Sequence, residues 1–324
     1  MGLFPGAGHD LRGQYVARVK ANVPLCREHY RLVLSLDEFP PTNPGQFVQV
    51  ACRDLAGNFS PETEMDWEPG RPWACGQELM SPLGLLRRPF SLAGRRDVAG
   101  GVELDLIHRV VGVGTGWLAR LETGDTVHIL GPLGNRFTLP PADGVAILVG
   151  GGVGIPPMLY LAERLAGRRA VAFCGALSSN LLPLTLTAAP PSPDAIEPVH
   201  VAAEFSIHGI PSVLTTDDGS YGFRGFVTQA LEKYLDQSAS VRPPTLYTCG
   251  PELMIKRVAQ IAADRGIEVQ VAVERAMACG MGTCQSCVIR LKRQPNDPAG
   301  RGRDWGYKLA CTDGPVFRGA DLLW

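Results

Sequence analysis

The chain has 324 residues, of which 45% are hydrophobic and 19% charged, and glycine (38) and proline (27) together make up about a fifth of it. This composition excludes a coiled coil, a disordered tail and a simple helical bundle, and the length predicts two domains with a small appendage. The formal net charge is −1 without a long block of one sign, which argues against nucleic acid or an anionic membrane as a partner.

The N-terminus shows no signal peptide, and no membrane span is expected. The longest uncharged apolar-looking stretch, 145–162, contains four glycines and two prolines near its middle. That pattern is typical of a strand, a glycine turn and a helix rather than of a spanning helix. We therefore expect a cytoplasmic protein.

Residues 12–142 are predicted to form an antiparallel β-barrel, because short strands alternate with Gly, Pro and Asp turns. The stretch 54–86 is rich in Gly, Pro and Trp and is expected to be a long inserted loop. Residues 131–135 are expected to form a turn that closes the barrel. The predicted strands are Gln14–Pro24, Tyr30–Asp37, Gln46–Arg53, Arg88–Arg95, Val102–Val111 and Thr126–Gly131.

Residues 143–266 are predicted to form a doubly wound α/β domain, because continuous apolar strands alternate with helices. The last strand, Glu268–Val273, opens a third domain, 267–324, which is too short for a large core of its own. The predicted strands of the second domain are Val145–Val149, Ala170–Gly175, Pro198–Ala203 and Thr245–Cys249, and its predicted helices are Pro156–Leu165, Gly225–Asp236 and Pro251–Asp264.

Four of the nine cysteines lie in the last 46 residues. Their pattern is Cys279-x4-Cys284-x2-Cys287, with Cys311 24 positions later. This is the spacing of plant-type [2Fe–2S] ligation, and the glycines between the first two cysteines allow the backbone to approach the sulfides. Zinc and unmetallated thiols stay open as alternatives, although structural zinc sites usually show paired short spacings.

Two motifs on barrel strands predict a ligand site. Arg88-Pro89-Phe90-Ser91 can place a fork of donors on a phosphate and a hydroxyl beside a planar ring. Ile107-His108-Arg109, followed by the glycine turn 112–115, can form a second anion or ring contact. A solvated edge strand and an ordinary loop are the alternatives.

A glycine loop, Gly150–Pro157, follows an apolar strand and is predicted to bind a nucleotide. It can turn the first helical N–H groups onto a pyrophosphate, although Gly152-x-Gly154-x-x-Pro157 departs from the strict dinucleotide fingerprint. Cys249, with Gly250 and Pro251, follows a later strand, where its thiol would lie near the reactive end of a bound cofactor. A buried, small hydrophobic residue is the alternative for Cys249.

Charge patterning favours NADH over NADPH. No lysine or arginine occurs in the 54 residues between Arg169 and Arg224, where a 2′-phosphate would need a cation, and Asp217 and Asp218 lie in the same span. The segment 288–303 is basic; it is interpreted as a solvated loop or as a docking face for a partner.

In this order the motifs resemble the ferredoxin reductase superfamily, and most closely the electron-transfer subunits of NAD-dependent dihydroorotate dehydrogenase. The resemblance implies FAD on the barrel, NAD(H) on the α/β domain and a [2Fe–2S] cluster at the C-terminal end. The residues that carry the resemblance are 88–91, 114–115, 131–135, 150–157, 217–222, 249–251, 274–287 and 311–317.

The candidate site residues follow from these motifs and the resemblance. Catalytic positions are assigned to Ser91 and Cys249. FAD contacts are assigned to Arg88, Pro89, Phe90, Ser91, Ile107, His108, Arg109, Gly114 and Thr115, NAD(H) contacts to Gly150, Gly152, Gly154, Asp218, Gly250 and Pro251, and cluster ligation to Cys279, Cys284, Cys287 and Cys311.

The implied function is electron transfer between NAD+ and an FMN-containing dihydroorotate dehydrogenase catalytic subunit, in a heterotetramer that serves pyrimidine biosynthesis. Two departures from the family pattern stand out: the insertion 54–86, which contains Cys75, and the 23 residues between Cys287 and Cys311. Two alternatives stay open. One is the small subunit of a ferredoxin:NADP oxidoreductase or sulfide dehydrogenase complex, whose cluster is expected to have a carboxylate ligand. The other is a zinc-stapled nucleotide-binding regulator without redox activity.

Overall fold

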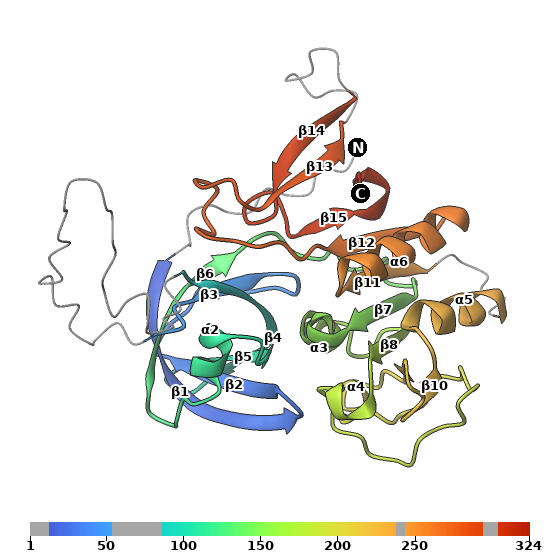
Figure 1. The fold of residues 1–324 in the computed structure, drawn as a ribbon, viewed down its shortest axis with the longest axis horizontal. Helices are drawn as coiled ribbons and strands as arrows, with labels where there is room; N and C mark the ends of the chain where they lie inside the picture. Colours follow the sequence, from blue (N-terminus) through green and yellow to red (C-terminus); the bar gives the residue numbers. More distant parts are fainter. Residues whose placement is uncertain (1–12, 54–85, 238–243, 294–303) are drawn as a thin grey trace, which may run out of the picture.

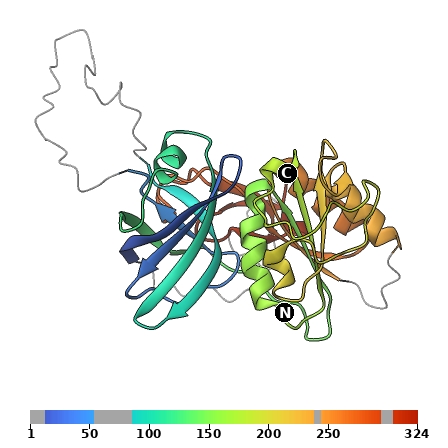
Figure 2. The same ribbon diagram turned by 90° about the horizontal axis from the view of Figure 1, so that it is seen from below.

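The computed structural model describes residues 13–53, 86–237, 244–293 and 304–324. The predicted insertion 54–86, with Cys75, therefore lies outside the described residues except for Leu86. A β-barrel and a layer of parallel strands and helices lie side by side, and a hairpin near the C-terminus rises from the region where they meet (Figures 1 and 2). No helix among the described residues is long and apolar enough to cross a membrane.

The barrel is antiparallel and closed in the order β1-β2-β5-β4-β3-β6, and it contains all six predicted strands. Alternate side chains such as Leu34, Val48 and Leu104 fill its interior. A short helix, α2 (Val113–Leu118), follows β5 where we expected only a glycine turn. The strands are β1 (Gly13–Cys26), β2 (His29–Leu36), β3 (Phe47–Val50), β4 (Arg88–Val98), β5 (Gly101–Arg109) and β6 (Thr126–Leu133).

The predicted closing turn at 131–135 is wrong in its first part, because β6 continues to Leu133. Asn135 then joins the barrel to the C-terminal region. Its Nδ2 donates to the backbone oxygens of Asp313 (3.0 Å) and Val316 (2.8 Å), and its Oδ1 accepts from the Val316 N–H (2.9 Å). A segment that we took for a local turn thus makes contacts about 180 residues away.

The second layer is a seven-stranded sheet in the order β10-β9-β8-β7-β11-β12-β15. All neighbouring strands are parallel except β15, which pairs antiparallel with β12. The strands are β7 (Ala146–Gly151), β8 (Ala170–Ala176), β9 (Ser212–Thr216), β10 (Phe223–Arg224), β11 (Thr245–Cys249), β12 (Glu268–Ala272) and β15 (Val316–Arg318), and the helices are α3 (Ile155–Arg164), α4 (Ala203–Ser206), α5 (Val227–Gln237) and α6 (Glu252–Asp264).

One predicted strand of this sheet, Pro198–Ala203, is wrong. That segment makes only isolated bridges, and Val199 and His200 are exposed. The strand beside β8 is instead β9, all five of whose residues are buried. Three of the five are Ser or Thr, so the strand lacks the apolar run that marks its neighbours, and its burial comes from the layers around it.

Part of the C-terminal region belongs to the seven-stranded sheet. Strand β12, which the sequence placed at the start of the third domain, lies in the seven-stranded sheet together with β15. The predicted loop 288–303 is wrong at its start, since β13 (Val288–Lys292) pairs with β14 (Trp305–Leu309) as a hairpin. Residues 294–303 lie outside the described residues, and the domain bounds themselves stay a prediction.

A buried tyrosine of α3 ties the barrel to the sheet. The Tyr160 side chain is fully buried, and its hydroxyl contacts both the hydroxyl and the backbone oxygen of Thr42, each at 2.8 Å. Arg164, one turn later, donates to the same backbone oxygen at 3.3 Å. These contacts hold the two layers in one arrangement, so a site between them has fixed walls.

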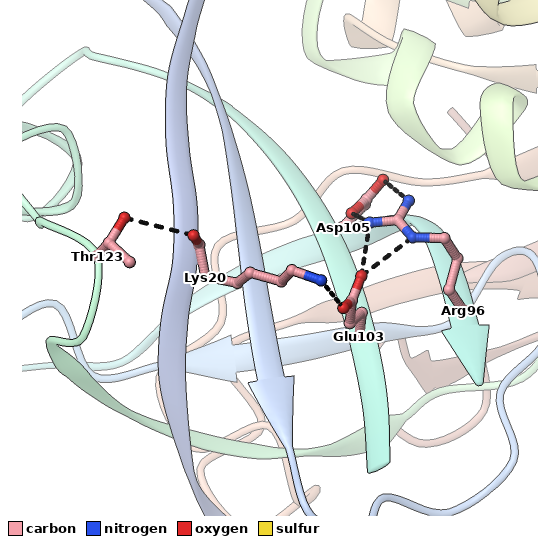
Figure 3. A network of polar contacts seen from close by, with 5 residues as sticks. All are labelled: Lys20, Arg96, Glu103, Asp105 and Thr123. Carbon is pink, nitrogen blue, oxygen red and sulfur yellow. Dashed lines mark hydrogen bonds and ion pairs between the residues drawn. The ribbon is translucent and has the colours of Figure 1, made fainter. Parts of the chain in front are cut away.

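A charged network also stabilises the barrel (Figure 3). Glu103 and Asp105 of β5 are both buried. Lys20 and Arg96 both donate to Glu103, and Arg96 also makes two 3.1 Å bonds to Asp105. Thr123 donates to the backbone oxygen of Lys20 at 3.3 Å.

Replacing Arg96 by alanine is expected to lower the midpoint of thermal unfolding by roughly 2–4 °C, because Asp105 loses a bidentate partner while Glu103 keeps Lys20. Differential scanning calorimetry measures the change. Arg18→Ala removes an exposed arginine of β1 and is the control. Equal midpoints for the two variants would contradict the stabilising role of this network.

Candidate functional site

A cleft of about 1650 Å³ opens between the barrel and the seven-stranded sheet. The ends of β4 and β5 and helix α2 form its barrel side, and the carboxyl ends of β7, β8, β9 and β11 form the other side. The segment 273–277, which follows β12, also lines it. Ligands of open parallel sheets bind at such strand ends, so both predicted binding motifs face one cavity.

The structure brings most sequence-predicted site residues to this cleft. Gly150, Asp218 and the four clustered cysteines are the exceptions, since none of them lines it. The predicted residues that line it are Arg88, Pro89, Phe90, Ser91, Ile107, His108, Arg109, Gly114, Thr115, Gly152, Gly154, Cys249, Gly250 and Pro251.

The two arginines on the barrel side differ in what they can bind. Arg109 donates twice to one carboxylate oxygen of Glu28, at 2.9 and 3.0 Å. Arg88 is exposed, and among the described residues its side chain makes a single hydrogen bond, of 3.3 Å, to the backbone oxygen of Leu86. Arg88 is therefore the cation that can turn its fork of donors toward a phosphate in the cleft.

Thr115 caps helix α2. Its hydroxyl accepts the N–H groups of Val111 (2.9 Å) and Gly112 (3.2 Å) and donates to the Gly112 oxygen (3.1 Å). The hydroxyl that we expected to contact a ligand thus already forms hydrogen bonds within the protein.

Two histidines of the cleft have ring nitrogens without partners. Both nitrogens of His108 and Nε2 of His29 are buried and make no hydrogen bond among the described residues. Burial, followed by the neighbouring His29, lowers the pKa of His108 to about 4, so its ring is neutral at pH 7. Phe90 meets this ring edge-on at 6.1 Å. A polar, planar ligand would satisfy these orphaned groups, and this fits a flavin in the cleft.

The glycine loop has mainly a packing role in this structure. A Cβ on Gly154 would lie 2.1 Å from the backbone oxygen of Cys249, and one on Gly151 would lie 2.5 Å from the Met254 sulfur. Gly152, with φ +52°, has open space around its position instead. The glycines therefore let the turn after β7 pack against the end of β11, and Gly152 is the one that leaves room for a ligand.

Cys249 lies at this junction and is 9% exposed. Burial, and then the charge of Glu274, raises the pKa of its thiol to about 12, so the thiol stays protonated at neutral pH. Desolvation also raises the pKa of Glu274. Sequence reasoning missed Glu274 as a cleft residue; its position five residues before the first clustered cysteine was the available signal.

The two neighbouring aspartates at the end of β9 have different roles. Asp217 lines the cleft, whereas Asp218 accepts the N–H of Ser220 at 2.9 Å in a tight turn. The Ser220 hydroxyl, and then that backbone bond, hold the pKa of Asp218 below its usual range. The candidate for contact with a nucleotide ribose is therefore Asp217, one position from the residue that we assigned.

Replacing Asp217 by asparagine is expected to raise the ratio of kcat/KM with NADPH to that with NADH by roughly tenfold, because the carboxylate that repels a 2′-phosphate is removed while a hydrogen-bonding side chain remains. Steady-state reduction of a dye with each nucleotide measures it. Asp218→Asn is the matched control, and an equal ratio change in both variants would contradict the assignment.

The four clustered cysteines lie around one loop. Cys279 Sγ accepts the N–H groups of Met281 and Cys284, each at 3.4 Å. Cys287 and Cys311 are buried in the core shared with the sheet. Burial, then Cys287 and to a smaller extent Cys279, raises the pKa of Cys311 to about 12, which indicates that these thiols are neighbours.

Ligation by these cysteines stays a prediction. No group of three or more potential ligand side chains close enough to hold a metal ion occurs in the described part of the chain. Several features nevertheless fit a cluster. Gly280 and Gly282 have φ of +71° and +86°, which wraps the backbone tightly, and N–H groups already point at Cys279 Sγ.

The cleft and the cysteine loop are joined by one short segment. Residues Val273 to Met277 line the cleft, and Cys279 follows two residues later. Met277 and Phe47 line the cleft and also belong to the core that contains Cys287 and Cys311. A group in the cleft and a group on the loop are thus separated by a wall of packed side chains that includes Phe47 and Met277.

Comparison with known proteins gives consistent results. The sequence model of a family described as "Iron-sulfur cluster binding domain of dihydroorotate dehydrogenase B" matches residues 274–323. The electron transfer subunit of dihydroorotate dehydrogenase B (NAD(+)) from Geobacillus kaustophilus is 37% identical over 241 residues, 74% of this chain and 80% of the relative. The one from Geobacillus sp. WCH70 is 33% identical over 303 residues, 93% of this chain and 95% of the relative.

A solved structure of an NADH-dependent reduced ferredoxin-NADP oxidoreductase, described in terms of flavin-based electron bifurcation, is similar in fold. It covers 95% of this chain and 90% of its own, with a TM-score of 0.68 and 23% sequence identity. This similarity concerns the fold alone and agrees with the predicted arrangement of a barrel followed by an α/β layer.

Proposed function

The chain belongs to the family of electron transfer subunits of dihydroorotate dehydrogenase B, and from this premise we propose that it connects NAD(H) in the cleft to a catalytic subunit docked at the cysteine loop. The observation that carries the proposal is the segment 273–279, whose residues 273–277 line the cleft and which ends at the first clustered cysteine. Electrons would pass between the loop and a nucleotide in the cleft across this wall.

The barrel side of the cleft is proposed to hold FAD. Arg88 would bind its phosphates, and the neutral, unpaired ring of His108 would contact its polar edge beside Phe90 and Ser91. When bound, FAD converts between the two-electron chemistry of nicotinamide and the one-electron chemistry of a [2Fe–2S] cluster.

The sheet side is proposed to hold NAD(H). Gly152 would leave room for the phosphates, Asp217 would accept from a ribose hydroxyl, and the protonated Cys249 thiol and Ser91, which line the same cleft, would help to position the nicotinamide. These residues position the nicotinamide and exclude water; none of them needs to transfer a proton.

The cysteine loop is proposed to hold a [2Fe–2S] cluster on Cys279, Cys284, Cys287 and Cys311. Cys284 is exposed, which puts one edge of the loop at the surface. The exposed face of the neighbouring hairpin carries Arg290 directly opposite Tyr307, and Lys292 two residues further along β13. This basic and aromatic face supports docking of an FMN-containing catalytic subunit in a heterotetramer, with electrons flowing from dihydroorotate to NAD+ in pyrimidine biosynthesis.

Anaerobic purification with the catalytic subunit tests the proposal. We expect flavin and [2Fe–2S] absorption, NADH-dependent dye reduction by this chain alone, and dihydroorotate-dependent NAD+ reduction only when both subunits are present. A colourless chain that contains zinc and does not reduce the dye would instead support the nucleotide-binding regulator. A cytoplasmic location and the heterotetramer remain predictions from the sequence.

A further inference from the structure

Strand β3 carries a glutamine that faces away from the barrel interior. Val48 and Val50 pack in the barrel core, so Phe47 and Gln49 point outward on the alternate positions. Phe47 packs in the core that contains Cys287 and Cys311. Gln49, two residues along the same face, is 0% exposed.

The amide group of Gln49 has no partner. Both Oε1 and Nε2 are buried and make no hydrogen bond within the described residues. Gln46, three positions earlier, shows the usual arrangement, because its Nε2 donates to the Gly134 oxygen at 3.1 Å and its Oε1 accepts the Asn43 N–H at 2.9 Å. Buried amides are nearly always hydrogen-bonded, so an orphaned one points to a group that is missing from the protein chain itself.

The Gln49 amide lies against the cysteine loop. A Cβ built on Gly280 would be 2.8 Å from Gln49 Cδ and 3.0 Å from its Nε2. Gly280 follows Cys279 directly and has φ +71°, so both its conformation and this close approach exclude a side chain there. The amide is thus packed onto the backbone beside the first clustered cysteine.

The cleft is a less suitable source of the missing partner. Phe47 lines the cleft, whereas Gln49 does not. The described neighbour of the amide is therefore the cysteine loop at Gly280, where the sulfur of the adjacent Cys279 is a possible acceptor.

We propose that Gln49 Nε2 donates a hydrogen bond to a sulfur at the Cys279 end of the [2Fe–2S] cluster and thereby raises the reduction potential of the cluster. This inference rests on the proposed function. Reduction adds negative charge to the cluster, and a donor that touches a sulfur stabilises the reduced form more than the oxidised form. The barrel would then influence both its own cofactor and the cluster beside it.

An EPR-monitored redox titration of the purified holoprotein tests the proposal. Gln49→Leu preserves the approximate size of the side chain and removes the donor, and it is expected to lower the ratio of reduced to oxidised cluster at a fixed potential by roughly tenfold, about 59 mV for one electron. Gln49→His retains an N–H donor and is expected to keep the ratio within about threefold of the wild type.

Gln46→Leu is the matched control, because it removes an amide whose bonds go only to the backbone. It is expected to leave the potential unchanged. If Gln49→Leu fails to fold, Gln49→Met offers an unbranched side chain of similar length without a donor, and its potential must then fall. An unchanged potential in a folded, cluster-containing Gln49→Leu or Gln49→Met protein overturns the inference, whereas a wild-type protein without a cluster signal would overturn the proposed function instead.

Discussion

Replacing Cys287 by serine is expected to reduce electron transfer to the catalytic subunit more than about 100-fold and to leave NADH-dependent dye reduction within about twofold of the wild type. Replacing a residue that only hydrogen-bonds to a metal ligand typically lowers metal affinity or activity by about 10–100-fold. Cys287 is assigned as a ligand itself, so its replacement should have at least that effect. Its sulfur lies in the buried core beside Cys311, and Cys287 itself does not line the cleft. The two activities should therefore separate.

The measurements are the visible spectrum, dye reduction with NADH, and dihydroorotate-dependent NAD+ reduction by the reconstituted complex. Cys174→Ser is the matched control, since Cys174 is an equally buried free thiol in β8 of the sheet. It should retain the cluster absorption and both activities. An equal loss of both activities in Cys287→Ser would show that the cluster region holds the whole chain together rather than serving only in electron transfer.

Replacing Arg88 by alanine is expected to weaken FAD binding by roughly 10–100-fold, because hydrogen bonds to charged groups contribute about 1.5–3 kcal/mol each. Arg88 lines the cleft, and within the part of the chain that the structure describes its side chain bonds only to the Leu86 backbone oxygen, so its other donors are available to a phosphate. The flavin content after dialysis and a fluorescence titration with FAD measure the effect.

Arg87→Ala is the control for this prediction. Arg87 precedes Arg88 in the chain but does not line the cleft, and its Nη2 lies 3.5 Å from the Gln14 Oε1. Its replacement should leave the FAD content near the wild-type value. Equal flavin loss from both variants would indicate that the arginine pair stabilises the barrel edge instead of binding the cofactor.

Much of the fold could be predicted because its signals are local. Every barrel strand and all but one of the predicted α/β strands coincide with a strand of the structure, since each has its own apolar pattern between turn residues. Strand β9 was not predicted, because three of its five residues are Ser or Thr and the strand lacks an apolar pattern although all five residues are buried. Helix α2 was not predicted, because six residues are too few to show a helical period.

The candidate site also has one part that the sequence predicted and another that it did not. The cysteine spacing is contained within nine residues, and the order of the glycine and arginine motifs follows from the chain alone, so the family and its cofactors could be predicted from the sequence. The turn after β9 decides whether Asp217 or Asp218 faces the cleft. Neighbouring side chains in an extended segment point in opposite directions, so the sequence alone does not distinguish the two.

The sequence by itself determined which chemistry this protein can perform, because the ligand spacings and turn residues are contiguous. Only the tertiary structure decided which side chains remain free to take part in it. Arg109 is occupied by a glutamate 81 positions away, Arg88 is not, and Gln49 meets the cysteine loop across more than 200 residues of chain. Whether a side chain is free to bind a ligand depends on its hydrogen-bond partners within the protein. Those partners are distant in sequence, and only folding brings them together.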